Sequence, residues 1–171
     1  MKKAIIVQFG DPVLRNTALP VTVFHKKLHA LIDTMRFTLQ SNDNGAALAA
    51  PQIGVSKRVV VIDYQGEYIE LVNPKILEST GTVVDEEGCL SFTGYSGLVQ
   101  RAETVKVQFQ DRYGEEEIIT RSGPMARCLQ HEIDHLDGIL YVDRMDRNAT
   151  VNDEYDTLSV EEVLEFTGSK T

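Results

Sequence analysis

The chain of 171 residues is 42% hydrophobic and 25% charged, a composition typical of a soluble globular protein with one core. Its formal net charge of -9 leaves no surplus of cations to neutralise phosphates, which argues against direct binding of nucleic acid. No apolar run is long enough to span a membrane, and the apolar start ends too early, at Gln8, for a signal peptide. We therefore predict one cytoplasmic domain over residues 1–171, with an acidic tail from about residue 147.

The first half of the chain predicts one amphipathic helix between two loops. Residues 10–15 form a loop, because Pro12 and Pro20 disfavour helix on either side. A helix is then expected from about residue 24 to 40, because apolar residues recur there at helical spacing: Leu28, Leu31, Ile32, Met35 and Leu39. The following segment, residues 45–54, is dominated by small residues, which predicts a tight loop or a closely packed strand edge.

The middle of the chain predicts antiparallel strands. Alternating or continuous apolar residues indicate strands at 58–63, 68–72, 82–84, 104–111 and 117–119. Asn73-Pro74 is expected to turn the chain out of the second of these, and residues 112–114 to form a hairpin tip.

Two further helices are expected in the last third. Ser122 is a candidate N-cap, Pro124 suits a first helical turn, and residues 137–138 would end that helix. In the tail, Ser159 and Glu162 match a capping box, so a short helix is predicted to run to Phe166.

The central motif lies in the first of these two helices. His131 and His135 are four residues apart, so both imidazoles can face one metal ion from the same side of the helix. Glu132 lies beside them, within reach of a water at that metal. A His-Glu-x-x-His pattern of this kind is typical of metal hydrolases that use the carboxylate as general base, although an ordinary helix with two histidines also matches so short a motif.

A catalytic metal site needs a third protein ligand and an open position. Candidates besides carboxylates are Cys89, Cys128, His25 and His29. Cys128 lies among apolar residues that suit a buried structural thiol, and the two histidines are expected to be exposed at the start of the first helix. Cys89 follows a strand and lies between Gly88 and Leu90, which makes it a plausible metal ligand; a buried, inert thiol is the alternative.

Three segments in this order resemble peptide deformylases, which remove the N-formyl group from new bacterial polypeptides. They are Gly45-x-x-x-Ala49-Ala50-Pro51-Gln52, Glu87-Gly88-Cys89-Leu90-Ser91 and Gln130-His131-Glu132-x-Asp134-His135-Leu136-x-Gly138. The resemblance extends to residues 10–15 and 137–144, and so covers the chain from near its start to about residue 146. Three motifs in the same order are far more specific than the histidine pair alone.

The resemblance implies a role for each matched residue. Cys89, His131 and His135 would hold one Fe2+ per chain, replaceable by Zn2+, Ni2+ or Co2+. Glu132 would be general base and then acid. Gln52 and the Leu90 amide would face the developing oxyanion. The substrate, an N-formylmethionyl nascent peptide, would contact a further set of residues: Gly45, Ala46, Ala47, Glu87 and Gly88.

Two features depart from the family pattern. Ala47 stands where the family usually has a second glycine, and its methyl group could crowd the peptide backbone or stiffen the loop. The tail is acidic, whereas family members that dock on the ribosome through a C-terminal helix use basic residues, so ribosome docking of that kind is not expected. We also expect Asp134 to pair with Arg101 and so fix the helix; a surface ion pair worth about 0–1 kcal/mol is the alternative.

We predict an α+β fold in which mixed, mostly antiparallel β-sheets surround a central metal-binding helix, with an amphipathic helix near the N-terminus. The rival enzyme class is a small metallopeptidase, which would leave Gly88-Cys89-Leu90 unexplained because such peptidases complete the site with His or Glu. The rival outside enzymes is a homologue that binds formylated or other peptides without catalysis. Ala47 favours that reading and Glu132 argues against it.

Overall fold

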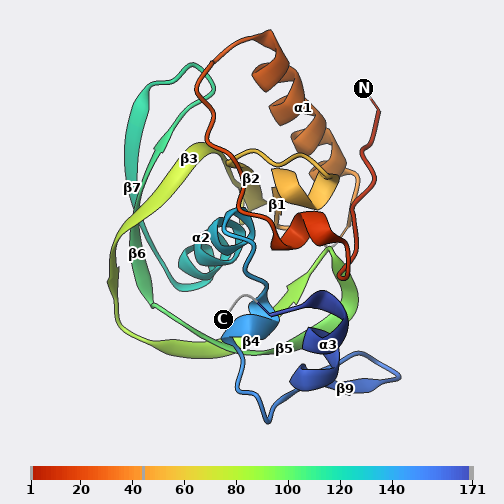
Figure 1. The fold of residues 1–171 in the computed structure, drawn as a ribbon. Helices are drawn as coiled ribbons and strands as arrows, with labels where there is room; N and C mark the ends of the chain where they lie inside the picture. The colour runs from red at the N-terminus through yellow and green to blue at the C-terminus, as the bar shows by residue number, and fades with distance from the viewer. Residues whose placement is uncertain (1, 44, 170–171) are drawn as a thin grey trace.

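A central helix, α2 (Gly123–Leu136), is surrounded by two antiparallel sheets in the computed structural model, which describes residues 2–43 and 45–169 (Figure 1). Most of its side chains are buried, including Leu129 and Ile133. These pack against sheet residues such as Leu71 and Val107 in the main core cluster. The predicted α+β class, with antiparallel sheets around one helix, is confirmed.

The larger sheet has five strands in the order β1-β2-β3-β6-β7, all antiparallel. They are β1 (Ala47–Ala49), β2 (Val59–Tyr64), β3 (Glu67–Thr80), β6 (Thr104–Gln110) and β7 (Glu116–Ser122). The alternation predicted for β6 is confirmed, because Val105, Val107 and Phe109 are buried while the residues between them are partly exposed.

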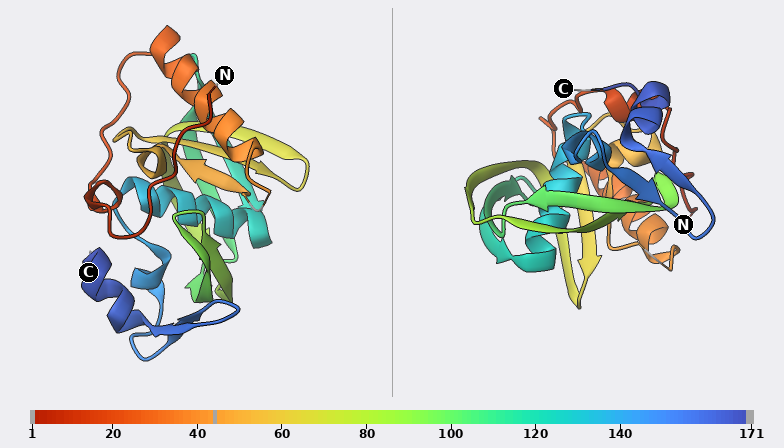
Figure 2. Two further views of the ribbon diagram at one scale, coloured as in Figure 1. Left: turned by 90° about the vertical axis from the view of Figure 1, so that its right-hand side faces the viewer. Right: turned by 90° about the horizontal axis from the view of Figure 1, so that it is seen from below.

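Helix α1 (Lys26–Gln40) covers the other face of this sheet. Leu28, Ile32 and Met35 are buried and contact Val59 and Val61 of β2 in one cluster, so the predicted amphipathic helix is confirmed. In Figure 2 (left), α1 lies at one end of the molecule and the C-terminal helix α3 (Val160–Thr167) at the other.

The smaller sheet has the order β4-β5-β8-β9. Its strands are β4 (Val83–Cys89), β5 (Phe92–Arg101), β8 (Thr150–Asn152) and β9 (Thr157–Ser159). Short 3-10 helices occur at Pro12–Arg15 (η1), Ala50–Ile53 (η2) and Tyr141–Arg144 (η3). The capping box predicted for the tail is present, since Ser159 caps α3 and exchanges hydrogen bonds with Glu162.

The turn predicted at Asn73-Pro74 is wrong, because β3 continues through both residues to Thr80. Pro74 lies in a register shift between Val72 and Lys75, where the pairing with β6 is interrupted. A residue without a backbone N–H is tolerated at such a bulge. Asn73 adopts a positive φ of 50° and bonds the backbone of Val21 through its side-chain amide. A bend within a continuous strand therefore replaces the expected exit from the sheet.

The ends of α2 place the helix against the N-terminal segment. Ser122 is the N-cap and Pro124 lies in the first turn, as predicted, although the Ser122 side chain makes no capping hydrogen bond. At the other end Gly138 has a φ of +72°, and its amide bonds the His135 carbonyl.

Over the described ranges, 2–43 and 45–169, no helix has the length and apolar character needed to cross a membrane.

We expect Gly138→Ala to lower the free energy of unfolding by about 2–6 kcal/mol, because it combines a left-handed backbone with a steric clash. A Cβ at this position would lie 2.4 Å from the Arg15 carbonyl oxygen. Gly54→Ala is the matched control, since Gly54 has a similar φ of +76° but nothing within 4 Å of the added Cβ. Urea unfolding monitored by circular dichroism should show the larger loss for Gly138→Ala; equal losses would contradict the clash.

Candidate metal centre

The two histidines of α2 face the same point from successive turns. His131 and His135 are both buried, and their ring centroids lie 5.0 Å apart. The helix begins at the end of β7, and its His135 lies next to the tip of the β4–β5 hairpin. The hairpin thereby brings a third donor to the two histidines. The i, i+4 spacing therefore brings both imidazoles to the same side of the helix, as the sequence predicts.

Cys89 supplies the third donor from the last position of β4. Its Sγ lies 3.3 Å from His135 Nε2, and one ligand atom from each of Cys89, His131 and His135 lies within 4.8 Å of the others. A thiolate and two imidazoles, with no fourth protein ligand in this group, match a metal centre that keeps a position open for water or substrate. The donor set fits a divalent ion of the Zn2+ or Fe2+ type.

The orientation of His131 is fixed by Glu87. His131 Nδ1 lies 2.8 Å from Glu87 Oε2, which leaves Nε2 for the metal, an arrangement found around many metal-bound histidines. Burial lowers the pKa of His131, but the hydrogen bonds to Cys89 and Glu87 prevail and raise it well above its ordinary value. The negative charges that favour a proton on His131 also favour a metal cation beside it.

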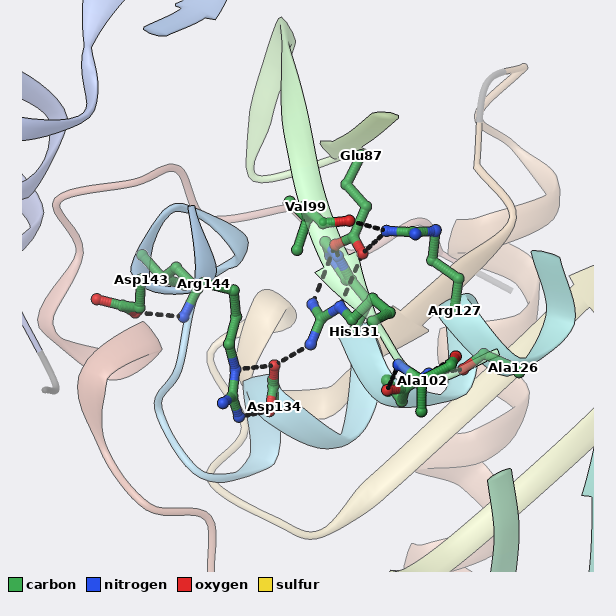
Figure 3. A network of polar contacts seen from close by, with 12 residues as sticks. Glu87, Val99, Ala102, Ala126, Arg127, His131, Asp134, Asp143 and Arg144 are labelled. Carbon is green, nitrogen blue, oxygen red and sulfur yellow. Dashed lines mark hydrogen bonds and ion pairs between the residues drawn. The ribbon is translucent and has the colours of Figure 1, made fainter. Parts of the chain in front are cut away.

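Glu87 is the centre of a buried ion cluster (Figure 3). Its two oxygens accept hydrogen bonds from Arg101 at 2.8 and 3.0 Å, and Oε1 also accepts one from Arg127 at 2.8 Å. Burial opposes ionisation of this carboxyl, but the hydrogen bonds from His131 and Arg101 hold its pKa well below the ordinary value. Glu87 is therefore a carboxylate anion that joins β4 to α2.

The predicted Asp134–Arg101 pair is present and buried. Arg101 Nη1 lies 2.5 Å from Asp134 Oδ2, and Arg144 bonds both oxygens of the same carboxylate at 3.1 and 2.8 Å. The alternative of a weak surface pair is wrong, since both side chains of the Arg101–Asp134 pair are nearly inaccessible. The outer face of α2 is thus tied to β5 and to η3.

Glu132 lies beside the ligands with a free carboxylate oxygen. Its exposed fraction is 5%, and its Oε2 finds no hydrogen-bond partner within the described part of the chain. Burial raises the pKa of Glu132 to about 7, which is the range suited to a group that takes up and releases a proton near neutral pH. Its position and environment match those of a general base.

Gln52 presents its amide N–H groups to the site. The Ala49 amide donates to Gln52 Oε1 at 2.8 Å, so the side-chain nitrogen faces Cys89 Sγ at 3.4 Å and Ser91 Oγ at 3.2 Å. Gln52 is 1% exposed and belongs to η2, directly after β1. This places an oriented, uncharged donor against the metal centre, as the oxyanion role requires.

A cavity of about 520 Å³ opens onto these groups between β1 and β4. Each of these strands is the edge strand of its sheet, so each can offer unpaired backbone groups to a bound peptide. The predicted site residues that line it are Ala46, Ala47, Gln52, Glu87, Gly88, Cys89, Leu90, His131 and Glu132. Gly45 and His135 do not line it; a Cβ at Gly45 would lie 2.7 Å from the Leu39 side chain.

The other candidate ligands do not belong to the metal-ligand group found in the described residues. Cys128 lines the cavity, but its sulfur is not part of the metal-ligand group found in the described residues, and burial raises its pKa well above the ordinary value. His25 is exposed, as expected, and caps α1 by accepting from the Leu28 amide. His29 is half-buried rather than exposed, because its ring nitrogen is 2.9 Å from the Arg112 carbonyl oxygen.

A sequence profile described as polypeptide deformylase matches residues 3–151. The chain belongs to the polypeptide deformylase family. It is 51% identical to the peptide deformylase of Desulfitobacterium hafniense, over 81% of this chain and 92% of that protein. It is 50% identical to that of Heliobacterium modesticaldum, over 84% and 94%. The family predicted from the three motifs is confirmed.

Solved deformylase structures share this fold. The crystal structure of the enzyme from Thermotoga maritima superposes with a TM-score of 0.83 at 42% identity, and covers 85% of this chain and 99% of that one. The enzyme from Synechococcus elongatus, in complex with actinonin, gives 0.83 at 36% identity over 99% of this chain and 91% of that chain. Deformylases are metalloenzymes, and the cluster of one cysteine and two histidines is present here.

The sequence did not reveal two further residues that line the cavity, Arg127 and Tyr95. Arg127 lies four residues before His131, so the helical spacing already placed it on the ligand face, where its guanidinium bonds Glu87. Tyr95 lines the cavity from β5, a strand that the sequence did not reveal because Gly94 and Gly97 interrupt its pattern. At Gly97 an added Cβ would lie 2.3 Å from the end of the Met145 side chain, which would have to move.

We expect Glu87→Gln to weaken metal binding about 10–100-fold, because an amide orients His131 less strongly than a carboxylate does. Competition with a chromogenic chelator measures the affinity. The variant also leaves Arg101 and Arg127 without their negatively charged partner, which lowers stability, so the measurement is made at a temperature well below unfolding. Glu86→Gln is the control: Glu86 is adjacent but exposed, and should bind metal as the wild type does. Equal affinity in the two variants would contradict the orienting role.

Proposed function

We propose that this chain is a metal-dependent amide hydrolase that removes the N-formyl group from the N-terminal methionine of newly synthesised polypeptides and releases formate. Membership of the deformylase family supports this activity. The observation that carries it is the convergence of Cys89, His131 and His135. Cys89 and His131 also line, with Glu132, a cavity between two edge strands. Release of formate from a formyl-Met peptide tests it directly.

The metal would be held by Cys89 Sγ and by one nitrogen each of His131 and His135. We infer Fe2+, one ion per chain, from the resemblance to the family, with Zn2+, Ni2+ or Co2+ able to take its place. When bound, the ion supplies Lewis acidity and makes a nearby water a stronger acid. Metal analysis of protein purified without oxygen identifies the ion.

Glu132 is the proton carrier in this proposal. Its carboxylate accepts the proton of the attacking water and returns it to the nitrogen of the leaving amine, so that one group serves as base and then as acid. The unpartnered Oε2 and the raised pKa support the role. Amide hydrolysis needs this second step because an unprotonated amine nitrogen is a poor leaving group.

Gln52 and the backbone N–H of Leu90 would stabilise the negative charge that develops on the formyl oxygen. Gln52 suits the position because its amide donates without carrying charge, and the Ala49 amide holds its orientation. Losing one such donor typically costs about 2.7–4 kcal/mol of transition-state stabilisation. Leu90 is placed at the hairpin tip, next to Cys89, where it lines the same cavity.

The peptide backbone would lie between the two edge strands, against Ala46 and Ala47 on one side and Glu87 and Gly88 on the other, whereas Gly45 packs behind this wall against Leu39. Ala47 is 7% exposed and packs within the main core cluster, which favours a stiffened strand over crowding of the substrate. Residues 1–171 form a single catalytic domain in this proposal, acting in the cytoplasm. The acidic α3 argues against ribosome docking through a basic C-terminal helix.

Cys89→Ser should lose most of the bound metal, because a serine hydroxyl is a far weaker ligand than a thiolate at neutral pH. Cys128→Ser is the matched control: its thiol is half-buried on the same cavity wall but lies outside the ligand group. Elemental analysis of the two variants, purified in parallel without oxygen, gives the metal content per chain. Equal retention would exclude Cys89 as a ligand.

Glu132→Gln should lower kcat by at least about 10²–10⁴-fold, because the amide keeps the shape but cannot accept a proton. KM should change little, since the lost interaction belongs to the transition state. Formate release and metal stoichiometry are measured on one preparation. Loss of metal together with activity would make Glu132 a ligand instead, and full activity would remove it from the mechanism.

A further inference from the structure

The strand β7 has a free edge. The larger sheet ends in β1 and β7, and the smaller one in β4 and β9. β1 and β9 have three residues each, and β4 lines the cavity of the metal centre. β7 has seven residues, and among the described residues it pairs along one side only, with β6. In Figure 1 it lies across the molecule from α3, so the C-terminal helix leaves its outer N–H and C=O groups open to a further strand.

Three alternate side chains of β7 lie on the face of the sheet that packs against α2. Each is opposite a buried residue of β6, and opposite residues of antiparallel strands share a face. They are Glu117, Ile119 and Arg121. Ile119 is the central residue of the strand and packs against the main core cluster. The inner face of this edge therefore carries an acid, an apolar residue and a base in that order.

One antiparallel register pairs this strand with itself over its whole length. A two-fold axis through Ile119, perpendicular to the sheet, places Glu116 of one copy opposite Ser122 of the other. The same register places Glu117 opposite Arg121, and by symmetry this pair occurs twice. A shift of two residues in either direction shortens the overlap and leaves Glu117 or Arg121 opposite Ile119, while a shift of one places opposite residues on different faces.

The charged groups of this register are available for pairing. Arg121 bonds Glu67 through Nε and Nη2, and the Thr120 carbonyl through Nη1. A guanidinium has five N–H donors, so one N–H on each Nη remains for a second carboxylate. Glu117 is exposed and forms no ion pair with any described residue. Pairing would place each Glu117 carboxylate beside a guanidinium, which offsets part of the repulsion between two chains of net charge -9.

We propose that β7 is a dimer interface, along which two copies of this chain join their larger sheets into one continuous antiparallel sheet. Ile119 meets its equivalent at the two-fold axis, with Cβ atoms about 4.5–5.5 Å apart, which extends the apolar core from one copy to the next. A second copy fits this edge because a single register satisfies the length of the strand, its central apolar contact and both ion pairs. The interface goes beyond the proposed deformylase activity and does not depend on it.

Sedimentation velocity tests the interface. Pairing of one edge strand buries little surface, as in weak complexes, so we expect the wild type to pass from monomer to dimer between about 10 μM and 1 mM. Arg121→Glu or Glu117→Arg alone places like charges opposite each other twice, and should weaken dimerisation at least about 10-fold. A wild-type chain that stays monomeric over this range overturns the proposal.

A mixture of the two variants identifies the register. In a dimer of one Arg121→Glu chain and one Glu117→Arg chain, each glutamate again faces an arginine, so the equimolar mixture should form the dimer that each variant alone lacks. Glu78→Arg and Lys106→Glu are the matched controls, because they make the same changes of charge at an exposed pair between β3 and β6, and each should dimerise as the wild type does. A mixture of folded variants that stays monomeric, or controls that lose the dimer, overturns the pairing of Glu117 with Arg121.

Hydrogen exchange tests the same edge in the unchanged chain. The β7 amides that do not bond β6 should exchange more slowly at about 1 mM than at about 10 μM, because the second copy protects them. The amides of β9, the edge strand of the smaller sheet, are the control and should not change. Equal exchange of the β7 amides at both concentrations, or protection of β9 instead, overturns the assignment to β7.

Discussion

The buried carboxylate of Glu87 holds the two halves of the metal centre together. It belongs to β4, which carries Cys89 two residues later, and it bonds His131 on α2 at 2.8 Å. An unpaired buried charge would be very costly, but Arg101 and Arg127 compensate this one. The distance between the thiol and the imidazoles thus depends on an ion cluster whose members come from different parts of the chain.

Such a cluster contributes more to specificity of position than to stability. Replacing a buried ion pair by apolar residues is often neutral or stabilising, whereas removing one partner typically costs about 3–5 kcal/mol. Arg101 illustrates the difference, because its guanidinium bonds Glu87 on one side and Asp134 on the other. A planar, fork-shaped cation can serve both carboxylates at fixed angles, which Lys could not.

The sequence predicted those parts of the site that depend on local periodicity or on a short motif. The histidine pair followed from helical spacing, and α1 and β6 from apolar patterns. Failures arose where tertiary contacts override local signals: Asn73-Pro74 stays in a strand because a bulge and the Val21 backbone accommodate it. Strand β5 was missed because Gly94, which has a positive φ, and Gly97, which packs against Met145, break the alternation that marks a strand.

The hairpin that presents Cys89 is supported from outside by segments near both ends of the chain. Phe92 stacks between Phe9 and Tyr95 with centroid distances of 4.7 and 4.5 Å, and Phe166 of α3 meets the Phe92 ring edge-on. The Tyr95 hydroxyl bonds Asp156 at 2.9 Å. Since α2 is buried and fixed by its ion pairs, the hairpin is the side of the site that could shift. Its aromatic support explains how a half-buried thiol near the hairpin tip keeps its place opposite two buried histidines.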